Sequence, residues 1–330
     1  MHAWLCDTPD GPTSLRWAEQ PTPEPGPGEI RLAVHAASLN FPDLLIVQGK
    51  YQFRPDPPFT PGSEYAGVVE AVGAGVTHLK PGDPVAALMG SGGFATHAVV
   101  KAASAMPLPP GFPLRDAAAF AFTYGTAHHA LVDRGQLKAG ETVFVLGAAG
   151  GVGTAAIQVA KAAGAIVIAG ASTDEKCALC KEIGADHVVN YVTTPLRDAL
   201  KSLTGGRGPD VVLDPVGGPL AETALRGIAW RGRYLVVGFA DGQIPALPWN
   251  LPLLKGASIV GVFWGDYVRR EPAANARMLG ELAQWYAQGK VKPVIDEILP
   301  LSRLQEAYTR IADRAILGKI VLVPDELLAR

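Results

Sequence analysis

Cysteine is scarce in this sequence, and so is any excess of charge of one sign. Three cysteines among 330 residues are too few for a disulfide framework, and their odd number favours a reducing compartment. Lys and Arg total 29 against 31 Asp and Glu, which gives a net charge of −2. Neither nucleic acid nor an anionic membrane is expected as a partner, because both call for a basic surface.

A long hydrophobic run and a recognisable targeting segment are also missing. The longest apolar stretch, residues 117–122, is followed by Thr123, Tyr124 and two histidines, so no segment is expected to span a bilayer. The N-terminal residues MHAWLCDTPDGP have neither a basic flank nor an apolar stretch, which argues against a signal peptide. Together these absences predict a soluble, cytoplasmic protein.

Apolar residues, by contrast, are abundant at 48%, and the chain contains 38 Gly and 28 Pro. This apolar fraction is enough for a large core, and the length, about twice that of an average domain, predicts two domains. Many short elements joined by tight turns are expected, because Gly and Pro are the strongest turn formers.

The pattern of elements divides the chain into two parts. Residues 1 to about 110 contain short β-branched segments separated by Pro/Gly turns, which favours a small, partly closed β structure. A helix is expected at 117–131. From Glu141 onward, short apolar strands alternate with helices, beginning with strands at 142–146 and 165–169. This alternation predicts a parallel sheet covered on both faces, the doubly wound arrangement.

A glycine-rich loop is the most informative motif. Residues 142–153 read TVFVLGAAGGVG and lead directly into an expected helix. A strand, a glycine turn and a helix N-terminus together accommodate a pyrophosphate, because glycine lets the phosphate approach the backbone and the helix dipole favours negative charge. The motif lies between the first strand and helix of the alternating series, where dinucleotide binding requires it. The residues expected to contact the dinucleotide are Gly150, Gly151, Val152 and Gly153.

The glycine spacing fits two motifs, G-x-x-G-x-x-G and G-x-x-x-G-x-G, both beginning at Gly147. The second is the form written for short-chain dehydrogenases, and Tyr286 and Lys290 have the Tyr-x-x-x-Lys spacing of their catalytic pair. That chemistry is not expected here, because the serine it needs upstream of Tyr286 is missing and a long segment precedes the glycine loop. Gly289 also indicates that the helix ends there.

Ala171, at the end of the second strand, occupies the position that selects between dinucleotides. An NAD enzyme usually has an acid there, which binds the ribose 2′-hydroxyl. Without that carboxylate, Ser172 and Lys176 offer a hydroxyl and an ammonium group to a 2′-phosphate. Asp174 and Glu175 lie close by and weaken the argument, although both also suit the start of a helix. The pattern favours NADPH over NADH.

No set of metal ligands is evident in the sequence. Cys6 is isolated, and Cys177 and Cys180 form a C-x-x-C inside an expected helix without a second pair. His128 and His129 are adjacent, so on a helix their side chains point about 100° apart and cannot chelate one ion together. The chemistry of the protein is therefore expected to be free of metal.

Six motifs are more specific together than any one of them alone. They are ASLNFPD at 37–43, GKY at 49–51, PGSEYAG at 61–67, the glycine loop at 147–153, GADHVVNY at 184–191 and GK at 318–319. Over essentially its whole length the chain resembles the medium-chain dehydrogenase/reductase superfamily, and within it the zinc-free, zeta-crystallin-like quinone oxidoreductases. Zinc-bearing relatives place Cys where this chain has Asn40 and His where it has Ser63, so the resemblance agrees with a metal-free site.

The resemblance implies an α/β fold with a doubly wound, Rossmann-type parallel sheet and a β-rich, partly closed, GroES-like barrel. The substrate domain is expected at residues 1–122 with 264–330, and the NADPH-binding domain at 123–263. The catalytic residues implied are Tyr51, Asn40 and Asp43. The further residues implied in cofactor binding are Thr126, Ser172, Lys176, Tyr191, Val216, Gly238, Phe239, Phe263, Trp264 and Lys319.

Some of these residues also have a purely structural interpretation. Asn40 and Asp43 fit the role of turn formers, and Glu64 that of a buried structural acid rather than a catalyst. Phe239 and Phe263 fit ordinary packing. These alternatives stay open at the level of the sequence.

The activity expected from this resemblance is hydride transfer from C4 of NADPH to a quinone or similar conjugated carbonyl. A quinone is a good electrophile without zinc, and hydrogen bonds from Tyr51, Asn40 or solvent stabilise the developing oxyanion and supply a proton. An enone or enoyl-thioester reductase is the alternative within the superfamily, and a non-enzymatic NADPH-binding protein is the alternative outside it. Because segment 258–263 is apolar and expected at the sheet edge, a homodimer joined edge to edge is also expected.

Overall fold

The computed structural model describes residues 1–328, and these residues form two compact units. Unit 1 contains Met1–Phe122 and the described residues from Ile295 onward, whereas unit 2 contains Thr123–Val294. The sequence interpretation places the return to the first domain at residue 264. In the structure residues 264–294 belong to unit 2, where Trp264 packs against Gly125 and Trp285 packs against His128.

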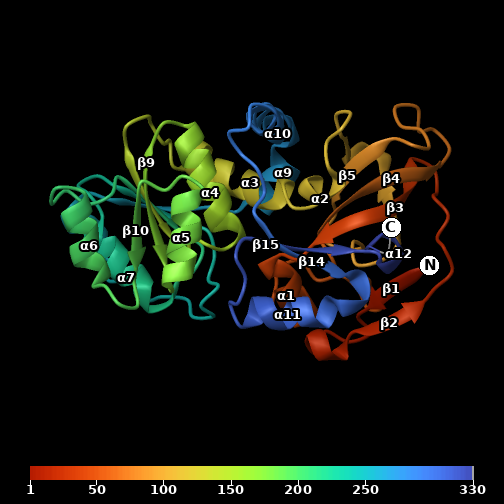
Figure 1. The fold of residues 1–330 in the computed structure, drawn as a ribbon, viewed down its shortest axis with the longest axis horizontal. Coiled ribbons are helices and arrows are strands. Elements are labelled where there is room, and N and C mark those ends of the chain that lie inside the picture. The colour runs from red at the N-terminus through yellow and green to blue at the C-terminus, as the bar shows by residue number, and fades with distance from the viewer. Residues whose placement is uncertain (329–330) are drawn as a thin grey trace. The chain divides into compact units, whose positions relative to one another are not determined.

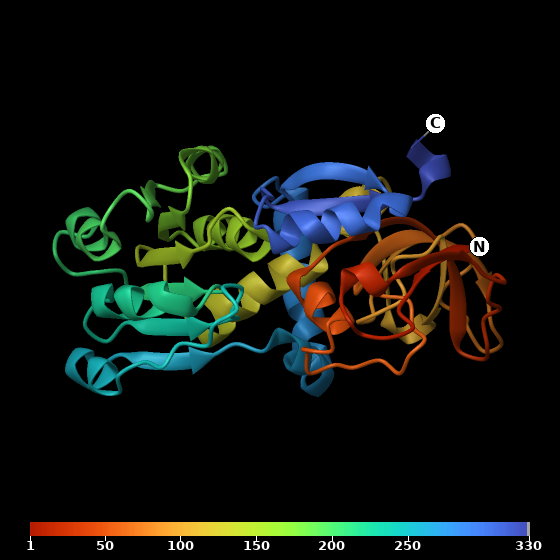
Figure 2. The same ribbon diagram turned by 90° about the horizontal axis from the view of Figure 1, so that it is seen from below.

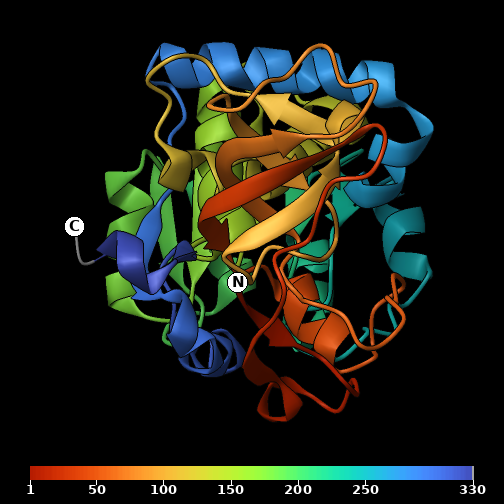
Figure 3. The same cartoon turned by 90° about the vertical axis from the view of Figure 1, so that its right-hand side faces the viewer.

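Unit 1 is built on strands of a mostly antiparallel sheet. These strands are β3 (Glu29–Ser38), β4 (Glu64–Val72), β5 (Pro84–Leu88), β6 (His97–Lys101), β7 (Ala105–Pro107), β14 (Ile295–Pro300) and β15 (Lys319–Val323). Their order is β14-β15-β3-β4-β5-β7, and β6 also pairs with β3. Along β3 buried residues such as Ile30, Leu32 and Val34 alternate with partly exposed ones, because one face of the sheet covers the core. Figure 3 shows the strands twisting around that core.

The remaining elements of unit 1 are short. A two-stranded antiparallel sheet joins β1 (His2–Leu5) to β2 (Arg16–Glu19). The helices are α1 (Phe41–Val47), α2 (Leu114–Ala117), α11 (Leu304–Ala312) and α12 (Asp325–Leu328). Helix α1 begins directly after Asn40, which is where the candidate site of this unit lies.

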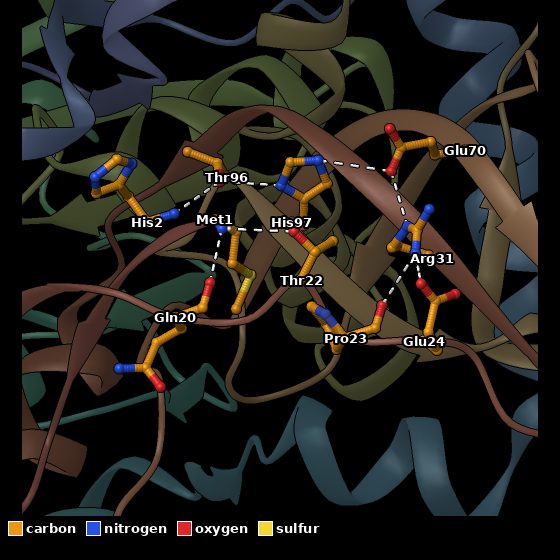
Figure 4. A network of polar contacts seen from close by, with 10 residues as sticks. All are labelled: Met1, His2, Gln20, Thr22, Pro23, Glu24, Arg31, Glu70, Thr96 and His97. Atoms are coloured by element: carbon orange, nitrogen blue, oxygen red, sulfur yellow. Dashed lines mark hydrogen bonds and ion pairs between the residues drawn. The ribbon is translucent and has the colours of Figure 1, made fainter.

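A network of polar contacts holds the N-terminal segment against the sheet of unit 1 (Figure 4). The ammonium group of Met1 donates to the carbonyl oxygen of Gln20 at 2.8 Å. The guanidinium of Arg31 pairs with the carboxylates of Glu24 at 2.7 Å and Glu70 at 2.8 Å. The network therefore links the first residues to β3 and β4.

Unit 2 contains a sheet of six parallel strands with the order β10-β9-β8-β11-β12-β13. Figure 2 shows strands of this sheet, coloured from yellow-green through teal to light blue, lying side by side. The strands are β8 (Thr142–Leu146), β9 (Ile166–Ala171), β10 (His187–Asn190), β11 (Val211–Asp214), β12 (Arg233–Val236) and β13 (Ser258–Gly261). Every residue of β8 is buried, because this central strand lies between β9 and β11. The doubly wound α/β class expected from the sequence is confirmed.

The helices of unit 2 cover this sheet. They are α4 (Gly151–Ala162), α5 (Asp174–Glu182), α6 (Leu196–Leu203), α7 (Gly218–Gly227), α8 (Asn250–Lys255), α9 (Trp264–Arg270) and α10 (Pro272–Ala287). Helix α4 contacts β8 and β9, and α5 contacts β9 and β10 (Figure 1). Within residues 1–328, no helix is both long enough and apolar enough to cross a membrane.

Residues 117–131, where the sequence predicts a single helix, are divided among several helical elements in the structure. These elements are α2, then α3 (Ala121–His128), then a π-helical segment at His129–Arg134. Helix α3 includes the boundary between the two units, which falls between Phe122 and Thr123.

Candidate functional site

The glycine loop of unit 2 connects β8 to α4 and has the features of an anion site. Gly147 adopts a φ of 63°, and a Cβ there would lie 2.6 Å from Val216 Cγ2. Gly150 is the N-cap of α4, and no side chain caps this helix. The uncapped N–H groups of the first turn suit a negatively charged group such as a pyrophosphate. The loop therefore fits the dinucleotide that the sequence predicts.

Two glycines in this loop have different functions. A Cβ at Gly153 would lie 2.4 Å from the carbonyl oxygen of Gly147, so this glycine lets α4 pack tightly against the loop. A Cβ at Gly150 would meet only that same oxygen, at 3.5 Å, which is an ordinary contact. Gly153 is therefore needed for packing, whereas Gly150 keeps the start of α4 open to a ligand.

The segment after β9 has no acid at the end of the strand, which is Ala171. Thr173 caps α5 by accepting the backbone N–H of Lys176 at 3.2 Å. Asp174 accepts a hydrogen bond at 2.7 Å from the amide of Asn190, the last residue of β10. Asp174 thus links the start of α5 to β10.

The C-x-x-C of α5 belongs to the packing of unit 2. Cys177 and Cys180 are both buried. Burial raises the pKa of the Cys180 thiol to about 12 and also raises the pKa of Cys177. Because the thiolate is the reactive form, neither cysteine is primed for redox or metal chemistry at neutral pH.

A buried carboxylate that the sequence analysis missed shapes the loops at the carboxyl end of the sheet. Asp214, the last residue of β11, accepts the backbone N–H groups of Val216 and Gly217, each at 2.8 Å. Its other oxygen accepts the Tyr234 hydroxyl at 2.5 Å. Phe239 lies against Gly217, where a Cβ would be 2.8 Å from its ring. An acid directly after an apolar strand was the available signal.

These contacts bring several predicted cofactor residues to one edge of the unit 2 sheet. Val216 lies beside Gly147, and Gly238 donates its N–H to the carbonyl oxygen of Asp214 at 3.4 Å. In parallel α/β sheets, ligands bind at the carboxyl ends of the strands. The loops after β8, β11 and β12 therefore form a continuous candidate dinucleotide site.

Other predicted cofactor residues of unit 2 are used partly for packing. Trp264 is buried against Gly125 and donates its indole N–H to Asn275 at 3.1 Å. Thr126 is buried within α3, whereas Phe263 is half exposed. Tyr191 is partly buried and packs on the core of the unit.

Unit 1 holds a second candidate site, which we call the buried polar cluster. Its members are Ser38, Asn40, Asp43, Ser63, Glu64 and Lys319, none of them more than 4% exposed. They come from β3, the start of α1, the start of β4 and the start of β15. Such a concentration of buried polar groups is stable only if their hydrogen bonds are satisfied.

Asp43 lies in the first turn of α1 and organises the adjacent backbone. One carboxylate oxygen accepts the Asn40 N–H at 2.8 Å. The other accepts the Ser63 N–H at 3.0 Å and the Ser63 hydroxyl in a short hydrogen bond. Burial raises the pKa of Asp43 to about 6, although these hydrogen bonds and Lys319 oppose the shift. The interpretation of Asp43 as a turn former therefore agrees with its contacts.

Glu64 and Lys319 form an ion pair inside the cluster, with Nζ 3.5 Å from Oε2. Lys319 also donates a short hydrogen bond to the Asn40 side-chain oxygen. Burial lowers the pKa of the Lys319 ammonium, and Glu64 and Asp43 oppose that shift. The ammonium group of Lys319 thus contacts Asn40 and Glu64 within unit 1, and the assignment of Lys319 to the cofactor stays a prediction.

Tyr51 is half buried in the loop that follows α1. Its ring packs against the core of unit 1, and Arg54 donates to its carbonyl oxygen at 3.2 Å. Burial and then the charge of Asp43 raise the pKa of the Tyr51 phenol. The phenol is therefore a weaker acid than an ordinary tyrosine, and like an ordinary tyrosine it is protonated at neutral pH.

The two adjacent histidines have partners in unit 2. His128 contacts the Glu281 carboxylate at 3.0 Å, and His129 stacks on Tyr267 with ring centroids 4.2 Å apart. Across residues 1–328, His, Cys, Asp and Glu side chains form no group of three or more that could hold a metal ion.

Comparison with known proteins agrees with both units. Residues 26–110 match the alcohol dehydrogenase GroES-like domain family, and residues 151–281 match the zinc-binding dehydrogenase family. The chain is 41% identical over 306 residues to quinone oxidoreductase-like protein 2 of Bos taurus, covering 92% of this chain and 88% of that protein.

Solved structures extend this similarity to the fold. The quinone oxidoreductase of Thermus thermophilus, also solved as a complex with NADPH, has a TM-score of 0.85 and 36% identity, over 98% of this chain and 100% of that one. A mycobacterial protein complexed with NADPH has a TM-score of 0.91 and 30% identity, with the same coverage. The fold and the sequence are those of a medium-chain dehydrogenase/reductase, a class of oxidoreductases that bind an NAD(P)-type cofactor. Within that superfamily, the chain belongs to the zeta-crystallin-like quinone oxidoreductase group.

The glycine loop yields a paired prediction. We expect Gly150→Ala to fold with a free energy of unfolding within about 1 kcal/mol of wild type, but to bind the dinucleotide at least about tenfold more weakly, because the methyl group occupies the anion site. Gly153→Ala should destabilise the protein by about 1–3 kcal/mol, because its methyl group overpacks the loop. Thermal unfolding and dinucleotide titration separate the two effects, and equal behaviour of the two variants would contradict the assignment.

The raised pKa of Asp43 leads us to expect that the stability of the protein depends on pH. The folded protein holds the Asp43 proton more tightly than the unfolded chain, since its pKa is about 6 instead of the ordinary 3.8. The free energy of unfolding should therefore fall by about 2–3 kcal/mol as pH rises from 4 to 6 and then level off. Asp43→Asn should lack this component in denaturant unfolding measured from pH 4.5 to 7.5. Asp7→Asn, at an exposed ion pair, is the control, and parallel curves for wild type and Asp43→Asn would refute the shift.

Proposed function

We propose that the protein is an NADPH-dependent, metal-independent reductase that transfers a hydride to a quinone or similar conjugated carbonyl. The observation that carries this proposal is the N-terminus of α4, which no side chain caps and which lies beside the loop that Asp214 holds in place. The neighbouring strand β9 ends in Ala171 and not in an acid. When bound, the dinucleotide supplies the hydride from C4 of its nicotinamide. The side chains of this protein then bind, orient and protonate the acceptor.

The preference for NADPH rests on the adenosine end of the site. Ala171 leaves no carboxylate at the end of β9 to repel a 2′-phosphate. Ser172, which offers a hydroxyl group, directly follows Ala171. Lys176, which offers an ammonium group, lies in the first turn of α5. One oxygen of Asp174 accepts a hydrogen bond from the side-chain amide of Asn190 on β10, so Asp174 also has a structural role. Gly150, Gly151, Val152 and Gly153 would bind the pyrophosphate through the start of α4.

Protonation of the reduced acceptor is assigned to Tyr51. Its phenol is half buried and protonated at neutral pH, so its hydroxyl group is available to donate a hydrogen bond and then a proton to the acceptor oxygen. The carboxamide of Asn40 is assigned to the oxyanion that develops on the acceptor, as a hydrogen-bond donor. A quinone needs no metal to polarise it, so with the hydride supplied by the dinucleotide, a proton from Tyr51 and a hydrogen bond from Asn40 complete the reduction.

We also propose that the protein forms a homodimer through β13. Ser258 and Val262 donate their N–H groups to residues of the neighbouring chain segment, Gly232 and Val236. By strand alternation, the main-chain groups of Gly261 face away from β12, toward the sheet edge. The Gly261 carbonyl oxygen accepts a hydrogen bond there from Arg134 Nε at 3.2 Å, so this edge is covered in part by an arginine side chain. The preceding α8 region exposes Trp249, Leu253 and Leu254 at 80%, 78% and 69%. A second copy would cover this edge and these side chains.

A cytoplasmic location stays a prediction.

The reaction is tested by following loss of nicotinamide absorbance in purified, chelator-treated protein. We expect oxidation of NADPH to be faster than that of NADH with a small quinone as acceptor. Activity with only an α,β-unsaturated ketone or thioester would move the reaction to the enone or enoyl-thioester alternative. Binding of NADPH without turnover of any acceptor would favour a non-enzymatic role.

Tyr51→Phe tests the proton donor in the same assay. We expect turnover to fall about a hundredfold with unchanged NADPH affinity, because only the phenolic hydroxyl is removed. Tyr286→Phe, at the tyrosine near the end of α10 that the sequence analysis excluded from catalysis, is the matched control and should keep wild-type turnover. Equal turnover of Tyr51→Phe and wild type would remove Tyr51 from the reaction.

The dimer is tested by sedimentation of Gly261→Lys. A Cβ at Gly261 meets nothing within 4 Å, so the subunit should fold, while a charge on the edge should prevent pairing of two sheets. We expect a dimer for wild type and a monomer for the variant. Gly280→Lys, at a similarly open position on α10, should remain dimeric. A wild-type monomer, or a variant that stays dimeric, would refute this interface.

A further inference from the structure

The side chain of Asn40 lies between two opposite charges. Its Oδ1 accepts a hydrogen bond from Lys319 Nζ, and its Nδ2 donates to Glu64 Oε2 at 3.2 Å. An ammonium group has only donors and a carboxylate only acceptors, so one orientation of the carboxamide satisfies both. Because all three residues are at most 4% exposed, water does not compete effectively for these bonds.

Glu64 is itself fixed on two sides. Its Oε2 also accepts the Ser38 hydroxyl at 2.8 Å, and its Oε1 accepts the Phe122 N–H in the first turn of α3 at 2.8 Å. A carboxylate held in this way cannot follow Asn40 if the carboxamide turns. The orientation of Asn40 is therefore imposed by its neighbours.

We propose that Lys319 is a positioning residue for acceptor reduction, which orients the Asn40 carboxamide and makes its Nδ2–H group a stronger hydrogen-bond donor. This inference rests on the proposed role of Asn40 toward the acceptor oxygen. A positive charge on the amide oxygen draws electron density from the nitrogen, so the remaining N–H carries more positive charge. Glu64 takes one of the two Nδ2 hydrogens, and the other is left for a ligand.

The structure thus provides a charge-assisted donor made from a neutral side chain. A bare ammonium group facing the acceptor would attract other anions and lack a fixed direction, whereas a carboxamide has a defined plane. Lys319 and Asn40 are 279 residues apart in sequence, so this arrangement depends on β15 entering the sheet beside β3.

The first measurement concerns the Asn40 side chain and needs neither cofactor nor turnover. In nitrogen-15 NMR spectra of the full chain, the Asn40 side-chain amide is identified by its loss in Asn40→Ala. We expect slow hydrogen exchange of this amide in wild type and fast exchange in Lys319→Met. Unchanged exchange in Lys319→Met would overturn the proposal whatever the substrate of the protein is.

The second measurement is acceptor reduction at saturating NADPH. We expect Lys319→Met to lower kcat about ten- to hundredfold with little change in KM for the acceptor, as for loss of part of an oxyanion-stabilising donor. In an Asn40→Ala background the same substitution should have no further effect, because Lys319 acts through Asn40. Additive losses would overturn the proposal.

Two further variants separate positioning from folding and from cofactor binding. The double variant Lys319→Met, Glu64→Gln removes both charges of the ion pair, so neither is left buried without its partner. A folded double variant with wild-type kcat would refute the proposal that the Lys319 ammonium group positions Asn40. Arg310→Met, which breaks the ion pair with Asp296 in the same unit, should leave kcat unchanged. A rise in the NADPH dissociation constant with unchanged kcat at saturation would assign Lys319 to the cofactor instead.

If wild type reduces no quinone, enone or thioester, the proposed function fails, whereas the exchange of the Asn40 amide still tests Lys319. Slow exchange that depends on Lys319 would then support the orientation of the amide. Wild-type kcat in Lys319→Met despite such exchange would refute its contribution to reduction.

Discussion

The buried carboxylate of Glu64 is the contact on which unit 1 depends. It accepts hydrogen bonds from Ser38 on β3, Asn40 before α1 and the backbone of α3, and it pairs with Lys319 on β15. A charge in the interior is tolerated only when its partners are all in place, since removing one partner leaves an uncompensated charge. One side chain thereby joins three separate parts of the chain: the end of β3 with the start of α1, the start of α3, and β15.

A second buried carboxylate has the corresponding role in unit 2. Asp214 holds the turn after β11 through two backbone N–H groups and binds the hydroxyl of Tyr234 on β12. The loops it shapes lie at the carboxyl ends of the strands, together with the glycine loop. In both units, a buried acid thus fixes the backbone around residues assigned to function and keeps those residues in place.

Much of the fold was accessible from sequence because it depends on local patterns. Apolar strands alternating with helices predict the parallel sheet of unit 2, and strand β8 differs by no residue from the expected 142–146. Boundaries set by tertiary packing were less accessible. The expected helix over 117–131 is divided into α2, α3 and a π-helical segment, and the chain returns to unit 1 at Ile295 rather than at residue 264.

The candidate site divides in the same way. The sequence by itself determined the glycine loop at 147–153 and the missing acid at Ala171, because both are properties of a few consecutive residues whose backbone conformation and chemistry are local. Only the tertiary structure decided that Lys319 contacts Asn40 and Glu64, and that Asp214 holds the neighbouring loop. No local pattern reports such contacts, because strand pairing and burial of charge bring together residues that lie up to 279 positions apart.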